Sequence, residues 1–254
     1  MKAFIIDRYG KSVVGQIAEM PEPTLAAGDV LVQVHAAGVN ALDVKIRNGE
    51  FKLILPYTLP LALGNDVAGV VLEVGVNVTR FKPGDEVYAR PHPSRIGTFA
   101  ERIAIDQSYV AAKPVNLTMV QAASLPLVAL TAWQVLVETA KVKPGQKVLI
   151  HAGSGGVGTV AIQLAKHLGA YVATTTSTAN VEWLKALSRT QQLGIGRIER
   201  VGEGLEARRP VDLHLRPPDP GVRRQPGPRL APEATYAVVE LPHPQTGQSA
   251  GLQL

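Results

Sequence analysis

The chain has 254 residues, 46% of them hydrophobic, a net charge of +5 and no cysteine. This length and apolar fraction predict one large or two smaller globular domains, and the lack of cysteine excludes disulfides, thiolate nucleophiles and zinc sites with Cys ligands. Because no run approaches the roughly 18 apolar residues of a membrane span and the first residues do not form a signal peptide, a cytoplasmic protein without a membrane partner is expected.

The positive charge is not gathered on one element. Every lysine lies at or before Lys185, whereas 9 of the 15 arginines lie from Arg189 onward, in a segment that also holds 9 of the 19 prolines. A nucleic-acid-binding surface requires basic residues clustered on one face. We therefore expect no nucleic-acid partner, and we interpret the distribution as a change of composition along the chain.

The first part of the chain has the pattern of a mainly-β domain, residues 1–117. Short apolar runs alternate with turn residues, and residues 82–85, with the sequence KPGD, are typical of a turn between strands. One helix is predicted within residues 40–49, where Asn40 can cap the first turn and Gly49 can end the last.

From residue 118 the period of the apolar residues becomes helical, with Pro126 breaking or starting a helix. The pattern then alternates between strands and helices, as at the beginning of a parallel α/β sheet. It predicts a buried strand (145–152), a helix (156–169), a second strand (171–177) and a second helix (180–187). One face of the first helix is expected to pack on that sheet; its residues are Val157, Val160, Ala161, Leu164 and Leu168.

The segment 188–254 is rich in Pro and Arg and lacks apolar periodicity, so it is expected to be poorly ordered. Only residues 235–241, with the sequence TYAVVEL, resemble a strand.

A glycine-rich loop lies between the first strand and the first helix of the α/β part. Gly153, Gly155 and Gly158 form GxGxxG in the context of a dinucleotide site. The first glycine permits a tight turn, the second lets the backbone approach a pyrophosphate, and the third allows close packing of helix on strand. The helix start then offers free N–H groups to phosphates. The predicted cofactor contacts in this loop are Gly153, Ser154, Gly155, Gly156, Val157 and Gly158; the alternative is a glycine-rich turn without a ligand.

Ser154 has a second interpretation, as the nucleophile of a strand-to-helix elbow in a hydrolase. That chemistry needs an acid and a histidine, for which Asp212 or Asp219 with His243 are the candidates. In the preferred interpretation Ser154 is a loop residue that donates to phosphate.

The end of the second strand indicates which dinucleotide is bound. An NAD site normally has a carboxylate there for the ribose 2′-OH, but residues 173–180 read ATTTSTAN, and the nearest acid, Glu182, lies inside the next helix. Ser177 and Asn180 could donate to a 2′-phosphate, which favours NADPH over NADH. Helix capping is the alternative role for both.

Three segments, 38–49, 63–90 and 145–166, resemble the zinc-free quinone oxidoreductase branch of the medium-chain dehydrogenase/reductases, and the resemblance covers about residues 1–187. It implies an α/β plus mainly-β fold: a GroES-like β domain at 1–117, then an incomplete Rossmann domain, a doubly wound parallel sheet, at 118–187. It also implies NADPH in the cleft between the domains and hydride transfer to a quinone or an α,β-unsaturated carbonyl. No metal site is predicted, because the histidines show no metal-ligand spacing.

The resemblance also assigns roles by position. Asn40 would donate a hydrogen bond near the nicotinamide and the substrate, and Asp43 and Arg47 could orient it or simply pair with each other. Tyr57 would line the substrate pocket, unless it is an exposed loop residue. Thr131 would lie beside the cofactor, unless it is an ordinary helical threonine.

The resemblance ends after about residue 187. The later Rossmann strands, the edge that forms the homodimer in the family, and the return of the chain to the substrate domain have no counterpart in the sequence. A shifted reading frame is one hypothesis, which the coding DNA tests, and a genuine variant tail is the other. The alternative to an active reductase is therefore a non-catalytic remnant with weak nucleotide binding.

Overall fold

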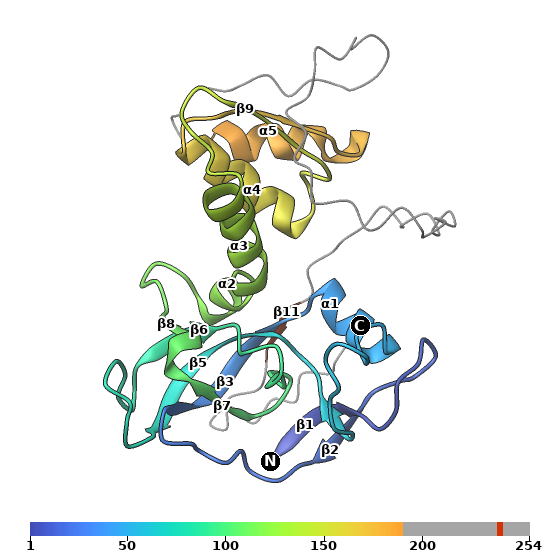
Figure 1. Ribbon diagram of the computed structural model, residues 1–254, viewed down its shortest axis with the longest axis vertical. Coiled ribbons are helices and arrows are strands. Elements are labelled where there is room, and N and C mark those ends of the chain that lie inside the picture. Colours follow the sequence, from blue (N-terminus) through green and yellow to red (C-terminus); the bar gives the residue numbers. More distant parts are fainter. Residues whose placement is uncertain (190–237, 241–254) are drawn as a thin grey trace. The chain divides into compact units, whose positions relative to one another are not determined.

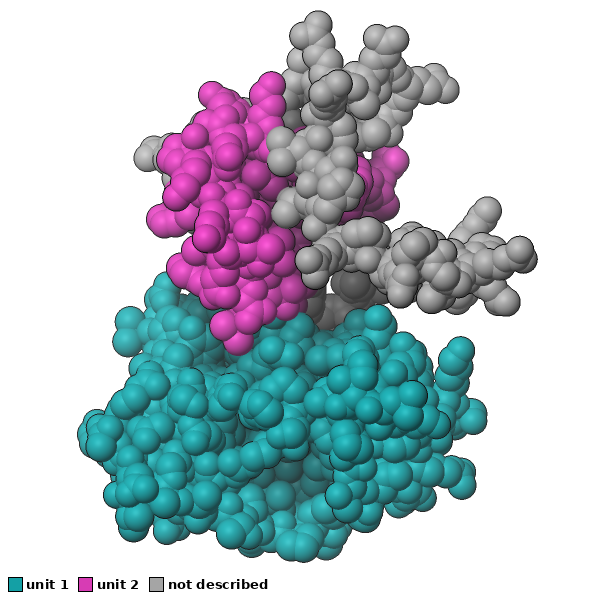
Figure 2. Space-filling model, in the orientation of Figure 1, with its two compact units in different colours: residues 1–127, 236–254 teal, residues 128–235 magenta. Residues whose placement is uncertain are grey.

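The computed structural model describes residues 1–189 and 238–240, which fall into two compact units (Figures 1 and 2). Unit 1 consists of residues 1–127 and 236–254, and unit 2 of residues 128–235. Most of the segment 188–254 lies outside the described residues, so its predicted disorder stays a prediction.

A mainly antiparallel sheet forms the centre of unit 1. Its strands are β3 (Asp29–Gly38), β5 (Asp66–Val74), β6 (Glu86–Ala89), β7 (Arg102–Asp106), β8 (Val110–Ala112) and β11 (Val238–Glu240). The order is β11-β3-β5-β6-β8, and β7 also pairs with β3. Alternate residues of β3 point inward, because side chains of a strand alternate between its faces; Val30 and Val32 are fully buried in the core.

A second, three-stranded sheet consists of β1 (Lys2–Ile6), β2 (Gln16–Glu19) and β4 (Leu61–Ala62). Helix α1 (Ala41–Asn48) contributes Ile46 to the same core as Ile6 of β1. The helix ends at Gly49, whose φ of 83° is in the left-handed region that glycine adopts without steric cost. The predicted helix and its terminator are confirmed.

The predicted turn at residues 82–85 is also present. The backbone N–H of Asp85 donates to the carbonyl of Lys82 (3.2 Å), and the Asp85 carboxylate accepts from both the backbone N–H and the ammonium of Lys82. Gly84 has a φ of 91°, so the glycine of KPGD is required by the backbone. A short 3-10 helix, η1 (Gln107–Tyr109), follows β7.

The first unit extends further along the chain than the change of period suggests. Thr118 caps α2 (Met119–Ala123), and Ala122 and Ala123 are buried against Ala36 and Ala68 of the large sheet. Because these side chains are small, the helix lies close to the strands and joins unit 1. The unit boundary therefore follows Leu127, later than the boundary after residue 117 that composition indicates.

The described residues of unit 2 have the predicted strand–helix–strand–helix order. The elements are α3 (Pro126–Trp133, which begins in unit 1), the π-helical η2 (Gln134–Thr139), β9 (Lys147–Ile150), α4 (Gly156–His167), β10 (Tyr171–Thr174), the 3-10 helix η3 (Thr178–Asn180) and α5 (Val181–Arg189). Strands β9 and β10 are parallel, and Pro126 begins a helix. In the described part of the chain, no helix is long and apolar enough to cross a membrane.

Two details of unit 2 differ from expectation. Strand β9 is not buried, since Leu149 is 51% exposed; a sheet of two described strands leaves one face open. Four of the five residues predicted to face the sheet pack in the core of unit 2: Ala161 is buried, and Val160, Leu164 and Leu168 are partly buried against it. Val157 is exposed, while Ile162 and Ala165, which lie outside the predicted face, are buried in the same core.

The chain does return to unit 1, contrary to expectation. Val238 pairs with Gly38, and Glu240 with Ala36, so β11 lies within the segment that resembles a strand. Strand β7 pairs with residues 29–33 of the same β3. A three-residue strand needs only backbone groups to pair, and composition does not reveal where it docks.

Candidate active site

The glycine loop of unit 2 connects β9 to α4 through a tight turn. The backbone N–H of Gly153 donates to the carbonyl of Thr175 (2.9 Å), and that of Gly155 donates to the carbonyl of Ala152 (2.9 Å). Gly155 is the N-cap residue of α4. The N–H groups of the first turn, which begins at Gly156, have no partner within the helix, and the first turn contains no acidic residue.

The three glycines of the motif are required for different reasons. A Cβ on Gly153 would overlap the hydroxyl of Thr174, and one on Gly158 would overlap the carbonyl of Ala152. Both positions are therefore fixed by packing within the protein. A Cβ on Gly155 would meet only the carbonyl of Ala152, at 3.2 Å, and its φ of −79° suits any residue.

Ser154 is held by the loop that follows β10. Its Oγ accepts from Thr176 Oγ1 (2.9 Å) and from Asn180 Nδ2 (3.1 Å). In a hydrolase elbow the nucleophile itself has the strained backbone. In this turn the residue with a positive φ is Ala152 (53°) and not Ser154. The proposed triad members Asp212, Asp219 and His243 lie outside the described residues.

The residues predicted for the 2′-phosphate lie beside this loop. Ser177 precedes η3, and its exposed side chain makes no capping hydrogen bond. The Asn180 side-chain amide donates to Ser154, and Glu182 lies in α5, in an ion pair with Lys185. Ser177 therefore does not cap η3, whereas the capping role of Asn180 stays a prediction. Thr131 lies half-buried on α3.

In unit 1, Asn40 and Asp43 belong to a buried polar cluster. The backbone N–H of Asn40 donates to Asp43 (2.7 Å), and the Asn40 side-chain amide donates to Asp66 (2.9 Å). Asn65 donates to the other Asp43 oxygen (2.6 Å), and the backbone N–H of Leu127 donates to the other oxygen of Asp66 (2.9 Å). The cluster ties together the start of α1, the start of β5 and the start of α3.

Burial of the two carboxyl groups disfavours their charged forms. Asp43 and Asp66 are 3% and 1% exposed. Desolvation raises the pKa of Asp43 to about 6. It raises the pKa of Asp66 to about 7, and the nearby charge of Asp43 adds to that shift. Within the described residues, no group of three or more His, Asp or Glu side chains is arranged to hold a metal ion.

The predicted alternative pairing of Asp43 with Arg47 does not occur. Arg47 donates to the Asn48 side chain, while Asp43 turns inward to Asn40 and Asn65.

Tyr57 lies against the same core as α1 and is half-buried rather than an exposed loop residue. Its hydroxyl donates to the carbonyl of Pro93 (2.6 Å). Desolvation raises the pKa of Tyr57, and the charge of Arg90 opposes that shift. Tyr57 therefore connects the core beside α1 to residues 91–95.

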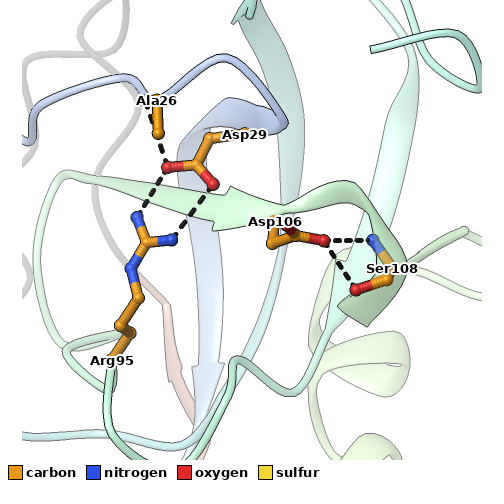
Figure 3. A network of polar contacts seen from close by, with 5 residues as sticks. All are labelled: Ala26, Asp29, Arg95, Asp106 and Ser108. Carbon is orange, nitrogen blue, oxygen red and sulfur yellow. Dashed lines mark hydrogen bonds and ion pairs between the residues drawn. The ribbon is translucent and has the colours of Figure 1, made fainter. Parts of the chain in front are cut away.

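An ion pair fixes the position of residues 91–95 (Figure 3). Both terminal nitrogens of Arg95 donate to Asp29, at 3.1 and 2.6 Å, and the backbone N–H of Ala26 donates to the same carboxylate. The Asp29 side chain is only 2% exposed. Bidentate pairing of this kind restrains both partners, so the segment that carries Pro93 is attached to the start of β3.

Sequence reasoning missed two members of the cluster, Asn65 and Asp66, and also Arg90, whose charge acts on Asp66. An Asn-Asp pair directly before an apolar strand is a weak signal of buried polar groups. Arg90 gave no signal, because its neighbourhood depends on strand pairing. Whether these residues and the predicted ones contact a ligand stays a prediction.

Comparison with known proteins assigns both parts of the chain. Residues 26–115 match the alcohol dehydrogenase GroES-like domain. The human protein "NAD(P)H oxidoreductase RTN4IP1, mitochondrial" is 38% identical over 233 residues, 85% of this chain and 59% of that protein. The "NADPH-dependent alkenal/one oxidoreductase, chloroplastic" of Arabidopsis thaliana is 40% identical over 196 residues, 74% of this chain and 50% of that protein.

Solved structures agree with this assignment. The quinone oxidoreductase from Coxiella burnetii is 40% identical, with a TM-score of 0.63 over 74% of this chain and 60% of that one. The chain thus spans between half and two thirds of the length of these relatives. The predicted fold class, a GroES-like domain combined with an α/β unit, is confirmed. The chain belongs to the medium-chain dehydrogenase/reductase superfamily, and its relatives there are quinone and enone oxidoreductases.

Proposed function

We propose that the protein is an NADPH-dependent reductase of quinones or α,β-unsaturated carbonyls that works without zinc. The observation that carries the proposal is the glycine loop, in which a Cβ would overlap its neighbours at Gly153 and Gly158 but would meet a single backbone oxygen, at 3.2 Å, at Gly155. A glycine with this little packing around it, at the start of a helix with free N–H groups, suits close approach of a pyrophosphate.

Ser154 supports the same site. A hydroxyl has one donor and two acceptor positions, and Thr176 and Asn180 occupy both acceptor positions of Ser154. Its hydrogen is left to donate to a further acceptor. A phosphate oxygen beside the N-terminus of α4 is such an acceptor, and the bonds from the two neighbours hold the hydroxyl in place for it.

The loop after β10 supports a 2′-phosphate. Residues 175–180 contain no carboxylate that would repel it, and the Ser177 hydroxyl is exposed and does not cap η3. Hydroxyl and amide donors can hold a phosphate without a lysine or arginine, although more weakly. The chain's relative in Arabidopsis is named as NADPH-dependent.

The nicotinamide, when bound, supplies the hydride. We assign the carbonyl end of the substrate to the polar cluster of unit 1, where Asn40 and Asp43 are held in place and Tyr57 lies close by. The chain has no cysteine for a catalytic zinc of the Cys-ligated kind.

The cytoplasmic location stays a prediction, because the two curated relatives are named as mitochondrial and chloroplastic. The missing homodimer interface also stays a prediction.

Two measurements on the full chain test the proposal. NADPH is mixed with a simple quinone or enone, and nicotinamide absorbance is followed; oxidation above the uncatalysed rate is expected. NADPH and NADH are titrated against tryptophan fluorescence, since Trp133 and Trp183 both lie in unit 2. Tighter binding of NADH would refute the assignment of residues 175–180, and no binding of either would refute the cofactor site.

A second candidate follows from the length comparison, because the chain covers 59% and 50% of its two curated relatives. It is a protein that binds NADPH without reducing a substrate. Quenching of tryptophan fluorescence by NADPH together with no oxidation above background, across quinones and enones, would favour this candidate over the reductase.

A further inference from the structure

Arg90 belongs to the polar cluster of unit 1 through strand pairing. It directly follows β6, and Val67 of β5 pairs with Ala89 of β6 in antiparallel register. One further step of that register places Arg90 opposite Asp66. Side chains directly opposite each other on antiparallel strands lie on the same face, with Cβ atoms about 5 Å apart.

The guanidinium of Arg90 has a buried donor without a partner. Its positive charge acts on both Asp66 and Tyr57, so it lies near both. No ion pair within the described residues includes it, and its Nε is shielded from solvent without a hydrogen bond. Arg95, five residues on, has both terminal nitrogens bonded to Asp29. Buried donors in native proteins nearly always have partners, which points to a ligand at Arg90.

Asn40 does not offer the same donor. Its amide group has two hydrogens, and its nitrogen donates to Asp66 at 2.9 Å and to the carbonyl of Gly38 at 3.5 Å. A carboxylate is a strong acceptor. A carbonyl oxygen that arrives at the cluster therefore finds its free donor on Arg90 rather than on Asn40.

We infer that the Arg90 guanidinium binds the carbonyl oxygen of the substrate and stabilises the negative charge that develops on it; this rests on the proposed function. When an enone takes up a hydride at its β-carbon, the C=C electron pair shifts toward the carbonyl carbon and the C=O pair moves to oxygen. The resulting enolate then takes a proton from water at its α-carbon and becomes the saturated ketone. A fixed cation at the oxygen stabilises this charge most in the transition state.

A stable oxyanion serves as the probe. The full-length protein without NADPH is titrated with 4-nitrophenolate, at a pH where the probe is ionised, and binding is followed by absorbance. Arg90→Met should weaken binding by about 10-fold or more, the effect of losing a hydrogen bond to a charged group. Arg90→Lys should weaken it less, because the charge stays but the planar fork is lost. Arg102→Met, which removes an arginine of a surface ion pair with Glu22, is the matched control and should bind like the wild type.

Equal binding by wild type and Arg90→Met would overturn the inference. If that variant does not fold, as judged by circular dichroism, Arg90→Lys decides, and wild-type affinity in it would also overturn the inference. The two proposals fail separately. If phenolate binding depends on Arg90 but the protein neither binds nor oxidises NADPH, only the proposed reductase activity is refuted. If the protein turns over substrate but Arg90→Met binds phenolate like the wild type, only the role of Arg90 is refuted.

Discussion

The buried carboxyl groups of unit 1 determine how single residues respond to pH. Asp66 accepts two hydrogen bonds, yet burial outweighs them and raises its pKa to about 7 from the ordinary 3.8. Between these values the folded protein holds a proton that the unfolded chain has released. Asp66 therefore lowers the stability of the folded state as pH rises through this window, and the loss levels off above about pH 7.

Asp66→Asn tests this dependence, because the substitution keeps the shape and removes the titrating group. The free energy of unfolding of the wild type should fall by up to about 4 kcal/mol from Asp66 alone between about pH 4 and pH 8. The fall should be clearly smaller in the variant. Urea unfolding across this pH range measures both.

Asp85→Asn is the matched control for that measurement. The pKa of Asp85 is lowered by its hydrogen bonds and ion pair with Lys82, so its contribution is lost as pH falls and has the opposite sign. This variant should keep the wild-type decrease toward high pH. A pH dependence that is the same in wild type and Asp66→Asn would contradict the buried-carboxyl explanation.

The Asp29–Arg95 pair gives a second prediction at the residue scale. Arg95→Ala leaves the buried Asp29 carboxylate with only the backbone N–H of Ala26, so it should lower the free energy of unfolding by ~2–4 kcal/mol. Arg102→Ala breaks a pair whose partners are 41% and 54% exposed and should cost less than about 1 kcal/mol. Urea unfolding compares the two; similar losses would show that the Asp29 pair is no stronger than a surface pair.

At the scale of elements, the glycine loop has a role in packing and, in our proposal, a second role in binding. Two of its glycines allow β9, β10 and α4 to approach each other, and a Cβ on the third would meet only one backbone oxygen. Substitutions in the same loop should therefore separate stability from cofactor affinity.

Gly153→Ala and Gly155→Ala are the pair that tests this separation. The first should lower the free energy of unfolding by about 1–3 kcal/mol, because its Cβ overlaps Thr174 and lies 2.9 Å from Ile162. The second should lower the free energy of unfolding less than the first, because its Cβ meets one backbone oxygen at 3.2 Å without overlapping it, and it should weaken NADPH binding. Thermal unfolding and fluorescence titration measure the two effects. Equal NADPH affinity in Gly155→Ala and wild type would contradict a pyrophosphate at this position.

Elements with strong local signals could be predicted from the sequence. The end of α1 at Gly49, the turn at residues 82–85 and the glycine loop each depend on residues close together in the chain. Asp66 and Arg90 could not be joined to Asn40 in this way, because they meet only through the pairing of β5 with β6. The exposed face of β9 was missed for a similar reason, since burial depends on how many strands and helices surround it.

At the scale of the whole molecule, the described parts of the two units differ in the size of their sheets and cores. Unit 1 has a large sheet and a smaller one, while the described part of unit 2 has two strands and a core of seven buried residues, which include Leu136, Ile162 and Leu184. Two strands are rarely stable by themselves, so the described part of unit 2 relies on its helices.

We expect unit 2 to unfold first. Trp133 and Trp183 report on it, so tryptophan fluorescence should change at a lower urea concentration than the final loss of β-sheet circular dichroism. NADPH should raise the midpoint of the fluorescence transition and leave the later transition unchanged, because a ligand stabilises the unit that binds it. Coincident transitions by both probes would show instead that the units unfold together.

The pairing of β11 with β3 affects how the protein can fold during synthesis. The edge of β3 at residues 36–38 pairs with residues 238–240, which are synthesised long after β3, so this edge of the N-terminal sheet stays open until they have been made. Domains generally fold in the order in which they are made. Here the middle of the chain can fold before the unit that precedes it is finished, and the open edge of β3 is the surface that a chaperone would have to protect in the meantime.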